Sequence, residues 1–172
     1  MKYEQFIRVT PDFPKKGVSF KDISPLLRDG AAFKAAVADI ADLAASFRPT
    51  VILGPEARGF VFGTPVAFEL GLGFIMARKE GKLPGATLSV TYGLEYGTDT
   101  IAIPDGLLKA GDRVVLVDDL LATGGTLAAL ARLIRQTGAA TVGAVSFIEL
   151  AGLGGAAKLE EEGVPFKAPL LL

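Results

Sequence analysis

The segment Arg113–Thr126 constrains the fold more strongly than any other part of the chain. Its apolar run Val114–Val117 has no polar interruption, which is typical of a strand that is buried on both faces of a parallel sheet. Asp118 and Asp119 end this run, and the small turn Thr123–Thr126 then leads into a helical pattern. The segment therefore predicts a strand, a turn and a helix that form one unit of an α/β sheet.

The two carboxylates and the turn also predict a ligand site. Open α/β sheets bind ligands at the carboxyl ends of their strands, so at least one of Asp118 and Asp119 is expected to face that site. The unpaired N–H groups and the dipole of the following helix favour an anion. Because paired carboxylates accept hydrogen bonds from vicinal hydroxyls, the combination indicates a sugar phosphate. An acidic strand end alone also occurs in ordinary strand–turn–helix units, so the interpretation depends on the whole segment.

The composition indicates a folded domain without a strongly charged surface. The chain has 172 residues, of which 50% are hydrophobic, and this argues against disorder. Eighteen Lys and Arg against nineteen Asp and Glu leave no overall basic field for a nucleic acid. No apolar run approaches the ~20 residues that cross a bilayer, and the N-terminal residues lack the apolar core of a secretory signal. A cytoplasmic location is therefore expected.

The absence of Cys and His restricts the chemistry of any site. It excludes disulfides, Cys/His zinc sites, Ser-His-Asp triads and Cys-His nucleophiles. Acid–base chemistry is left to Asp, Glu, Lys or Tyr. A metal must then be held by oxygen atoms, and Mg²⁺ is the expected ion beside phosphates.

Helical and strand patterns alternate along most of the chain. Apolar residues recur at helical spacing from Asp29 to Arg48, where Pro49 ends the helix. The other expected elements are the strands Val51–Leu53, Phe74–Ala77 and Thr141–Leu150, the helices Phe60–Leu70, Leu127–Gln136 and Ala156–Glu162, and a hairpin of Leu88–Tyr92 with Thr98–Ile103. This alternation predicts a single α/β domain over residues 1–172, with a doubly wound, mainly parallel sheet, helices on both faces and a projecting β-hairpin lid.

Two other segments are less regular. Residues 1–28 have no sustained period and contain three prolines, so we expect a short helix near Lys2–Val9 and then an irregular arm. At the base of the hairpin, the three cations Arg78, Lys79 and Lys82 precede a Pro-Gly pair. This pattern suits a movable lid over anions, although a plain solvated hairpin has the same composition.

Two glycine-containing turns resemble nucleotide-binding motifs only loosely. The turn Gly54–Gly59 lacks the Lys and the Ser or Thr of a P-loop, and we interpret it as a helix N-terminus where Arg58 adds donors for an oxyanion. The segment Gly152–Ala157 fits the dinucleotide pattern GxGxxA, but no acidic residue ends the next expected strand, Val164–Leu170. We interpret it as a small-residue turn into the last helix.

The segment Val114–Thr126 resembles the phosphoribosyl-pyrophosphate-binding motif of the type I phosphoribosyltransferases. Three further segments are similar to members of this family that act on adenine. Phe13–Ile23 resembles their base-site arm, Glu56–Gly63 their pyrophosphate-side turn, and Arg78–Gly85 with Leu94–Gly97 their flexible catalytic loop, which would span residues 78–103. These matches follow the family's order and cover most of the chain.

The resemblance implies transfer of the 5-phosphoribosyl group from phosphoribosyl pyrophosphate to N9 of adenine, giving AMP and pyrophosphate with Mg²⁺ as the metal. It implies that Asp118 and Asp119 hold the ribose hydroxyls and that the 5-phosphate binds to a run of five residues, Ala122, Thr123, Gly124, Gly125 and Thr126. The pyrophosphate would meet the cations Arg58, Arg78, Lys79 and Lys82, in part from the other subunit of a homodimer.

The resemblance also assigns the base site. Glu95 is the expected acid/base group near N7 of the purine, and backbone groups near Ser19 and Lys21 would read the edge of adenine. Ser19 stands where the family commonly has an aliphatic residue and Lys21 where it often has Arg. The family's turn further implies a cis peptide between Glu56 and Ala57. The direct metal ligands are not assigned.

Two alternative functions remain at this point. One is the same chemistry on a 6-oxopurine, because the two departures lie in the base site. The other is a non-catalytic regulator that senses phosphoribosyl pyrophosphate. A DNA-binding regulator of that kind is expected to carry a basic face and a helix-turn-helix extension, and neither is evident in the sequence.

Overall fold

The computed structural model describes residues 2–93 and 97–172. Within these residues, eight strands form the main sheet, in the order β10-β8-β7-β3-β4-β6-β5 with β9 paired to β8. The strands are β3 (Val51–Pro55), β4 (Gly73–Lys79), β5 (Thr87–Gly93), β6 (Thr98–Pro104), β7 (Arg113–Leu121), β8 (Ala140–Glu149), β9 (Phe166–Lys167) and β10 (Leu170–Leu171). The strands from β10 to β4 are parallel, whereas β6 pairs antiparallel with both β4 and β5.

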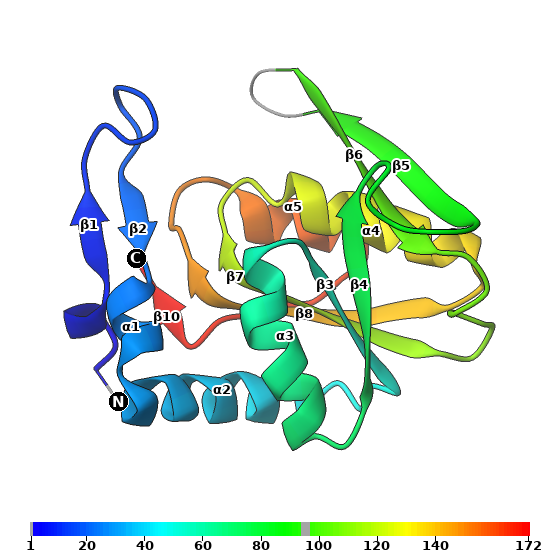
Figure 1. Cartoon of the computed structure of the whole chain (residues 1–172), viewed down its shortest axis with the longest axis horizontal. Helices are drawn as coiled ribbons and strands as arrows, with labels where there is room; N and C mark the ends of the chain where they lie inside the picture. Colours follow the sequence, from blue (N-terminus) through cyan, green and yellow to red (C-terminus); the bar gives the residue numbers. More distant parts are fainter. Residues whose placement is uncertain (1, 94–96) are drawn as a thin grey trace.

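Helices cover both faces of this sheet (Figure 1). The helices α2 (Gly30–Ala45) and α3 (Arg58–Glu69) pack on one face, and α4 (Gly125–Gln136) and α5 (Gly155–Glu161) lie on the other. The Asp29 side chain caps α2 by accepting hydrogen bonds from the N–H groups of Ala31 and Ala32. The predicted doubly wound α/β fold is therefore confirmed. No helix among the described residues is both long and apolar enough to span a bilayer.

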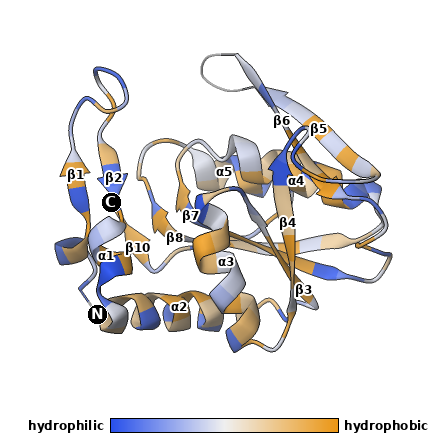
Figure 2. Cartoon of the chain, in the orientation of Figure 1, coloured by the Kyte–Doolittle hydropathy of each residue, from blue (hydrophilic) through white to orange (hydrophobic). Residues whose placement is uncertain are grey.

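The central strand β7 contributes to a separate hydrophobic core on each face of the sheet. Val114 and Leu116 pack into the core beneath α4, whereas Val115 and Val117 pack into the core beneath α2 and α3. All four side chains are fully buried. Figure 2 shows hydrophobic colours along the central strands β3, β4, β7 and β8. The uninterrupted apolar run thus has the two-sided burial that the sequence predicts.

The hairpin of β5 and β6 is present and projects beyond the helices, as the sequence predicts (Figure 1). Its strands extend slightly further than expected, from Thr87 to Gly93 and from Thr98 to Pro104. The hairpin packs against α4, so it stands over the end of the sheet where the strand β7 leads into that helix.

The expected helix near Lys2–Val9 is wrong. The structure has a single 3-10 turn, η1 (Glu4–Phe6), and then an antiparallel hairpin of β1 (Arg8–Thr10) and β2 (Phe20–Asp22) before the short helix α1 (Ser24–Arg28). The pairing partner of β1 lies beyond a proline-containing loop, so no local period in the sequence reveals the strand. The irregular arm is therefore a small second sheet.

Other strand boundaries also differ from the predicted ones; β3 and β4, for example, are each longer than expected. The strand β7 continues past the acid pair to Leu121, because β8 keeps pairing with it as far as Glu149. The expected strand Val164–Leu170 is instead divided into β9 and β10. Pro169 lies between these two strands and has no N–H group to donate to a ladder.

Candidate active site

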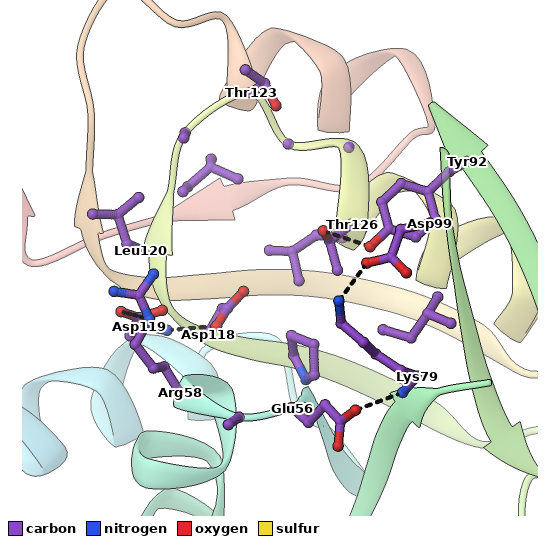
Figure 3. A pocket seen from close by; sticks show the side chains of 18 of the residues that line it. Glu56, Arg58, Lys79, Tyr92, Asp99, Asp118, Asp119, Leu120, Thr123 and Thr126 are labelled. Atoms are coloured by element: carbon purple, nitrogen blue, oxygen red, sulfur yellow. Dashed lines mark hydrogen bonds and ion pairs between the residues drawn. The ribbon is translucent and has the colours of Figure 1, made fainter. Parts of the chain in front are cut away.

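A cavity of about 330 Å³ opens at the carboxyl end of the parallel strands, between the β7–α4 turn and the β5–β6 hairpin (Figure 3). Nine of the residues predicted from the sequence line it: Arg58, Lys79, Asp118, Asp119, Ala122, Thr123, Gly124, Gly125 and Thr126. The structure therefore brings the acid pair, the small turn and two of the expected cations together in one hollow.

The acid pair forms the floor of the cavity beside α3. Asp119 is 3% exposed, and its Oδ2 lies 3.2 Å from Nε of Arg58. This Oδ2 accepts no hydrogen bond from the described residues. Asp118 Oδ1 accepts a hydrogen bond of 2.9 Å from the backbone N–H of Asp119. A buried carboxylate oxygen without a donor is suited to a ligand that carries hydroxyl groups.

Burial raises the pKa of both carboxyl groups of the acid pair. It raises the pKa of Asp118 well above the usual range, and the adjacent charge of Asp119 raises it further. Burial also raises the pKa of Asp119, although the Arg58 guanidinium opposes this shift. Asp119 is buried and Asp118 is half-buried, so this neighbouring pair lacks sufficient positive charge or donors within the described protein. Ribose hydroxyls or a cation would supply them.

The turn behind the acid pair is held in shape by α5. Gly124 has a φ of 75°, and a Cβ at this position would lie 2.7 Å from the carbonyl oxygen of Gly155. Conversely, a Cβ on Gly155 would lie 2.3 Å from the carbonyl oxygen of Ala122. The interpretation of Gly152–Ala157 as a small-residue turn is therefore confirmed, and its Gly155 permits close contact between α5 and the β7–α4 turn.

The lid hairpin reaches the other side of the cavity through two polar contacts (Figure 3). Lys79 Nζ lies 3.1 Å from Asp99 Oδ2 on β6. The hydrogen bond to Asp99 raises the pKa of the Lys79 ammonium, so this group stays charged. Thr126 Oγ1 donates a hydrogen bond of 3.2 Å to Tyr92 Oη on β5. The hairpin is thus connected to β4 and to the start of α4.

Arg78 and Lys82 do not line the cavity. Arg78 Nε lies 2.8 Å from Glu56 Oε2, and its Nη1 donates to the carbonyl oxygen of Lys82. Burial raises the pKa of Glu56, but the Lys79 N–H and the Arg78 guanidinium outweigh this and hold it below the usual range. Glu56 therefore fixes the base of the lid against the turn that precedes α3. The structure separates Arg78 and Lys82 from Lys79, which faces the cavity.

Ser19 and Lys21 lie on the arm and do not line the cavity either. Lys21 Nζ donates to Ser19 Oγ at 3.2 Å, and this contact is exposed. The residue between them, Phe20, is the one that approaches the site, because the Arg58 guanidinium lies over its ring at 5.5 Å. Phe13 packs edge-on against Phe20. The arm thus meets the acid pair through an aromatic ring and Arg58.

Comparisons with known proteins agree with this arrangement. The family model described as a phosphoribosyl transferase domain matches residues 26–165. The adenine phosphoribosyltransferase of Desulfitobacterium hafniense (strain Y51) is 52% identical over 160 residues, which are 93% of this chain and 92% of that protein. The chain belongs to the adenine phosphoribosyltransferase family. Its resemblance to the type I phosphoribosyltransferases is thereby confirmed.

Solved structures of adenine phosphoribosyltransferases have the same fold. The enzyme of Thermoanaerobacter pseudethanolicus ATCC 33223 superposes with a TM-score of 0.94 at 45% identity, covering 98% of this chain and 97% of that one. The adenine phosphoribosyl transferase of Trypanosoma brucei, solved with AMP, pyrophosphate and ribose 5-phosphate, has a TM-score of 0.88 at 26% identity. That match covers 99% of this chain and 77% of the other.

Of two further expectations taken from the family, the structure bears on the cis peptide but not on the role of Glu95. The peptide bond between Glu56 and Ala57 is cis, as the resemblance implies. Glu95 and its neighbours Leu94 and Tyr96 lie outside the described residues, so the assignment of Glu95 as an acid/base group remains a prediction.

No role was predicted from the sequence for four residues that line the cavity or contact its Arg58. Glu56, Tyr92 and Asp99 line the cavity, and Phe20 contacts Arg58. Tyr92 and Asp99 pair directly across the hairpin on either side of its tip. A cross-strand pair of polar residues next to a predicted lid was a signal that could have identified both. Phe20 gave no such signal, because aromatic residues in an arm are commonly buried.

Proposed function

We propose that the chain transfers the 5-phosphoribosyl group of phosphoribosyl pyrophosphate to N9 of adenine, giving AMP and pyrophosphate. One observation carries this proposal: in a member of the adenine phosphoribosyltransferase family, the adjacent carboxylates of Asp118 and Asp119 share one cavity with a helix N-terminal turn. Adenine rather than a 6-oxopurine is favoured by the relatives from D. hafniense and T. pseudethanolicus, which are both adenine phosphoribosyltransferases.

Asp118 and Asp119 are proposed to accept hydrogen bonds from the ribose hydroxyls, and residues 122–126 are proposed to bind the 5-phosphate. The buried Oδ2 of Asp119, which lacks a donor among the described residues, supports the first role. The second role is supported by the helix N-terminus at Gly125, where unpaired N–H groups favour an anion. Two different groups of one ligand would thus be bound on adjacent parts of the β7–α4 unit, which fixes the orientation of the sugar between them.

The reaction separates charge, and the protein is proposed to stabilise that separation. As the bond at C1 of ribose breaks, the sugar gains oxocarbenium character and pyrophosphate leaves as an anion. Lys79 faces the cavity and remains charged, so it is the best placed of the predicted cations to meet the pyrophosphate. Arg58 is paired with Asp119 and lies over Phe20, which favours a position for it near the ribose and the base.

Mg²⁺ is proposed to accompany phosphoribosyl pyrophosphate. No group of three or more Asp or Glu side chains that could hold a metal ion occurs within residues 2–93 and 97–172. Mg²⁺ is commonly held by one or two carboxylates together with substrate phosphates and water. Of the four carboxylates that line the cavity, the adjacent Asp118 and Asp119 lie on the strand that leads into the proposed phosphate-binding turn and fit this description. When bound, Mg²⁺ neutralises charge on the leaving pyrophosphate.

The base is proposed to bind between the arm and the acid pair. Backbone groups near Ser19 and Lys21 would read the edge of adenine. The contact of Arg58 with Phe20 supports this location, because it joins the arm to the floor of the cavity. The side chains of Ser19 and Lys21 bond to each other, so the proposal assigns recognition of the base to backbone groups rather than to these side chains.

Glu95→Gln is expected to lower turnover by roughly 100-fold and to leave the Kd for phosphoribosyl pyrophosphate within about twofold. The reason is that glutamine keeps the shape of the side chain but cannot exchange a proton with the purine. Single-turnover kinetics and a binding titration measure the two quantities separately. Unchanged turnover in both Glu95→Gln and Glu95→Ala would rule out the proposed role.

A homodimer is proposed through the faces of α3 and β4. Phe68 on α3 is 86% exposed and Met76 on β4 is 45% exposed, and large exposed apolar side chains commonly mark protein contacts. Arg78 lies on the same strand as Met76 and does not line the cavity of its own chain, which supports a contribution of the lid base to the partner's site.

Phe68→Asp is expected to convert the dimer to a monomer at micromolar concentration, because the variant would bury a charge in the interface. Sedimentation velocity measures this change. Leu107→Asp is a matched control, since Leu107 is 58% exposed but lies in the turn after β6. A monomeric wild type, or equal effects of the two variants, would contradict the assignment of this interface.

A panel of bases tests the function. The protein is incubated with phosphoribosyl pyrophosphate, Mg²⁺ and each of adenine, hypoxanthine, guanine, xanthine and uracil, and nucleotide and pyrophosphate are measured. AMP formation with adenine alone is expected. Turnover with an oxopurine would keep the reaction but refute the assignment of the base. Binding of phosphoribosyl pyrophosphate without any turnover would instead favour the alternative function, a non-catalytic regulator that senses phosphoribosyl pyrophosphate.

A further inference from the structure

Tyr92 connects the lid hairpin to the turn at the start of α4. Tyr92 is 8% exposed, and a Cβ on Gly125 would lie 3.8 Å from its ring atom Cδ2, which places the ring against this turn. Its hydroxyl is the acceptor of the hydrogen bond from Thr126 Oγ1 (Figure 3). Tyr92 is therefore positioned to affect the orientation of the Thr126 hydroxyl.

Only one of the two hydroxyl groups can donate its proton in the hydrogen bond between Thr126 and Tyr92. Each hydroxyl has one proton to donate and lone pairs to accept with. In this structure Thr126 donates its proton to Tyr92 Oη at 3.2 Å, and the Tyr92 proton is donated to no described residue. Asp99, the cross-strand neighbour of Tyr92, is engaged with Lys79 through Oδ2 and with the N–H of Thr100 through Oδ1. The Tyr92 hydroxyl is thus a donor at the cavity that lacks an acceptor within the described part of the chain.

We propose that Tyr92 is a positioning residue for the 5-phosphate site. The inference rests on the proposed binding of that phosphate at residues 122–126. A phosphate dianion is a stronger acceptor than a phenol, so Thr126 would turn its proton to the phosphate. The Tyr92 hydroxyl then donates to Thr126 Oγ1 and strengthens the Thr126–phosphate hydrogen bond.

The position of Tyr92 on β5 gives this hydrogen bond a second effect. The β5–β6 hairpin also contributes Asp99, which pairs with Lys79 on the other side of the cavity. Phosphate bound to Thr126 therefore stabilises the hairpin where Tyr92 joins it, before the base reacts. Binding of phosphoribosyl pyrophosphate, rather than of adenine, is the step that this contact affects.

Steady-state kinetics of Tyr92→Phe test the proposal. The KM for phosphoribosyl pyrophosphate is expected to rise about fivefold, as for the loss of one hydrogen bond, while kcat and the KM for adenine change by less than about twofold. Tyr3→Phe is the matched control: it also removes a buried tyrosine hydroxyl, which donates to Asp39 on α2. This control is expected to lower the melting temperature without changing either KM. A uniform change of kcat and both KM values in Tyr92→Phe would overturn the proposal.

A double-mutant cycle with Thr126 separates this inference from the proposed function. Thr126→Val alone is expected to raise the KM for phosphoribosyl pyrophosphate at least tenfold, and Tyr92→Phe is expected to add nothing in that background. In the Thr126→Ser background, which keeps the hydroxyl, Tyr92→Phe is expected to keep its fivefold effect. No effect of Thr126→Val would refute the phosphate site itself. Additive effects of Thr126→Val and Tyr92→Phe would refute only the role of Tyr92.

Discussion

Asp118→Asn is expected to raise the melting temperature of the ligand-free protein by about 2–4 °C while turnover falls by on the order of 100-fold. Burial and the neighbouring Asp119 raise the pKa of Asp118 above its value in the unfolded chain. The folded state therefore binds more protons than the unfolded state, and stability falls as the pH rises through the raised pKa. Above this raised pKa the full penalty of the buried charge is present, and asparagine removes it.

The same substitution removes a charge that the reaction is proposed to use. The carboxamide oxygen of the new side chain can still accept the N–H of Asp119, as Asp118 Oδ1 does, so the local backbone geometry is preserved. The negative charge opposite the developing oxocarbenium ion is lost, and so is one acceptor for a ribose hydroxyl. Stability and activity are thus expected to change in opposite directions. This is typical of functional groups whose position destabilises the folded protein but is needed for the reaction.

Thermal unfolding across pH, combined with assays at saturating substrate, measures both effects. The difference in melting temperature between wild type and Asp118→Asn is expected to shrink as the pH falls, because wild-type Asp118 then becomes protonated. Asp42→Asn, at an exposed position on α2, is the matched control and is expected to change the melting temperature by less than about 1 °C. A lower melting temperature for Asp118→Asn at neutral pH would contradict the argument.

The sequence predicts those parts of the site that are contiguous in the chain. The strand, the acid pair, the turn and the helix of Arg113–Gln136 belong to one local unit, in which apolar periodicity and turn residues carry the information. The hairpin β5–β6 was predictable for the same reason, since its two strands are close in sequence and rich in β-branched residues. Local patterns therefore suffice for most of the cavity floor and for the lid.

The parts that were missed depend on contacts between distant segments. β1 is recognisable only with its partner β2, and the role of Phe20 appears only when α3 brings Arg58 over its ring. The four cations expected at the pyrophosphate looked equivalent in sequence. In the structure, Glu56 binds Arg78 outside the cavity and Asp99 holds Lys79 within it. Ion pairs between segments that are distant in the sequence made this distinction, and no local spacing in the sequence predicts it.

Gly155 is the clearest case of a residue whose importance only the folded structure reveals. In the sequence it is one of three glycines in a loose dinucleotide pattern. In the structure, a Cβ on Gly155 would lie 2.3 Å from the Ala122 carbonyl oxygen and 2.8 Å from Leu121 Cγ. The first of these contacts is with the backbone, so no change of side-chain rotamer relieves it. A larger residue at this position must displace either α5 or the β7–α4 turn.

Gly155→Ala is therefore expected to destabilise the fold by about 2–3 kcal/mol, which lowers the melting temperature by about 5–10 °C. The KM for phosphoribosyl pyrophosphate is expected to rise at least tenfold, because the displaced turn is the proposed 5-phosphate site. Gly30→Ala is a matched control: Gly30 is also the first residue of its helix, but a Cβ there has no neighbour within 4 Å. This control is expected to leave the KM unchanged and to alter stability by less than about 1 kcal/mol.

The melting temperature and the KM for phosphoribosyl pyrophosphate together show which element the added methyl group displaces. If α5 moves, stability falls while the KM for phosphoribosyl pyrophosphate remains near the wild-type value. If the turn moves, both quantities change, and this is the expected result because the turn ends in Gly124 and Gly125, which have no side chains to anchor it. Equal stability and equal KM in Gly155→Ala and Gly30→Ala would show that the close packing of Gly155 on Ala122 does not shape the site.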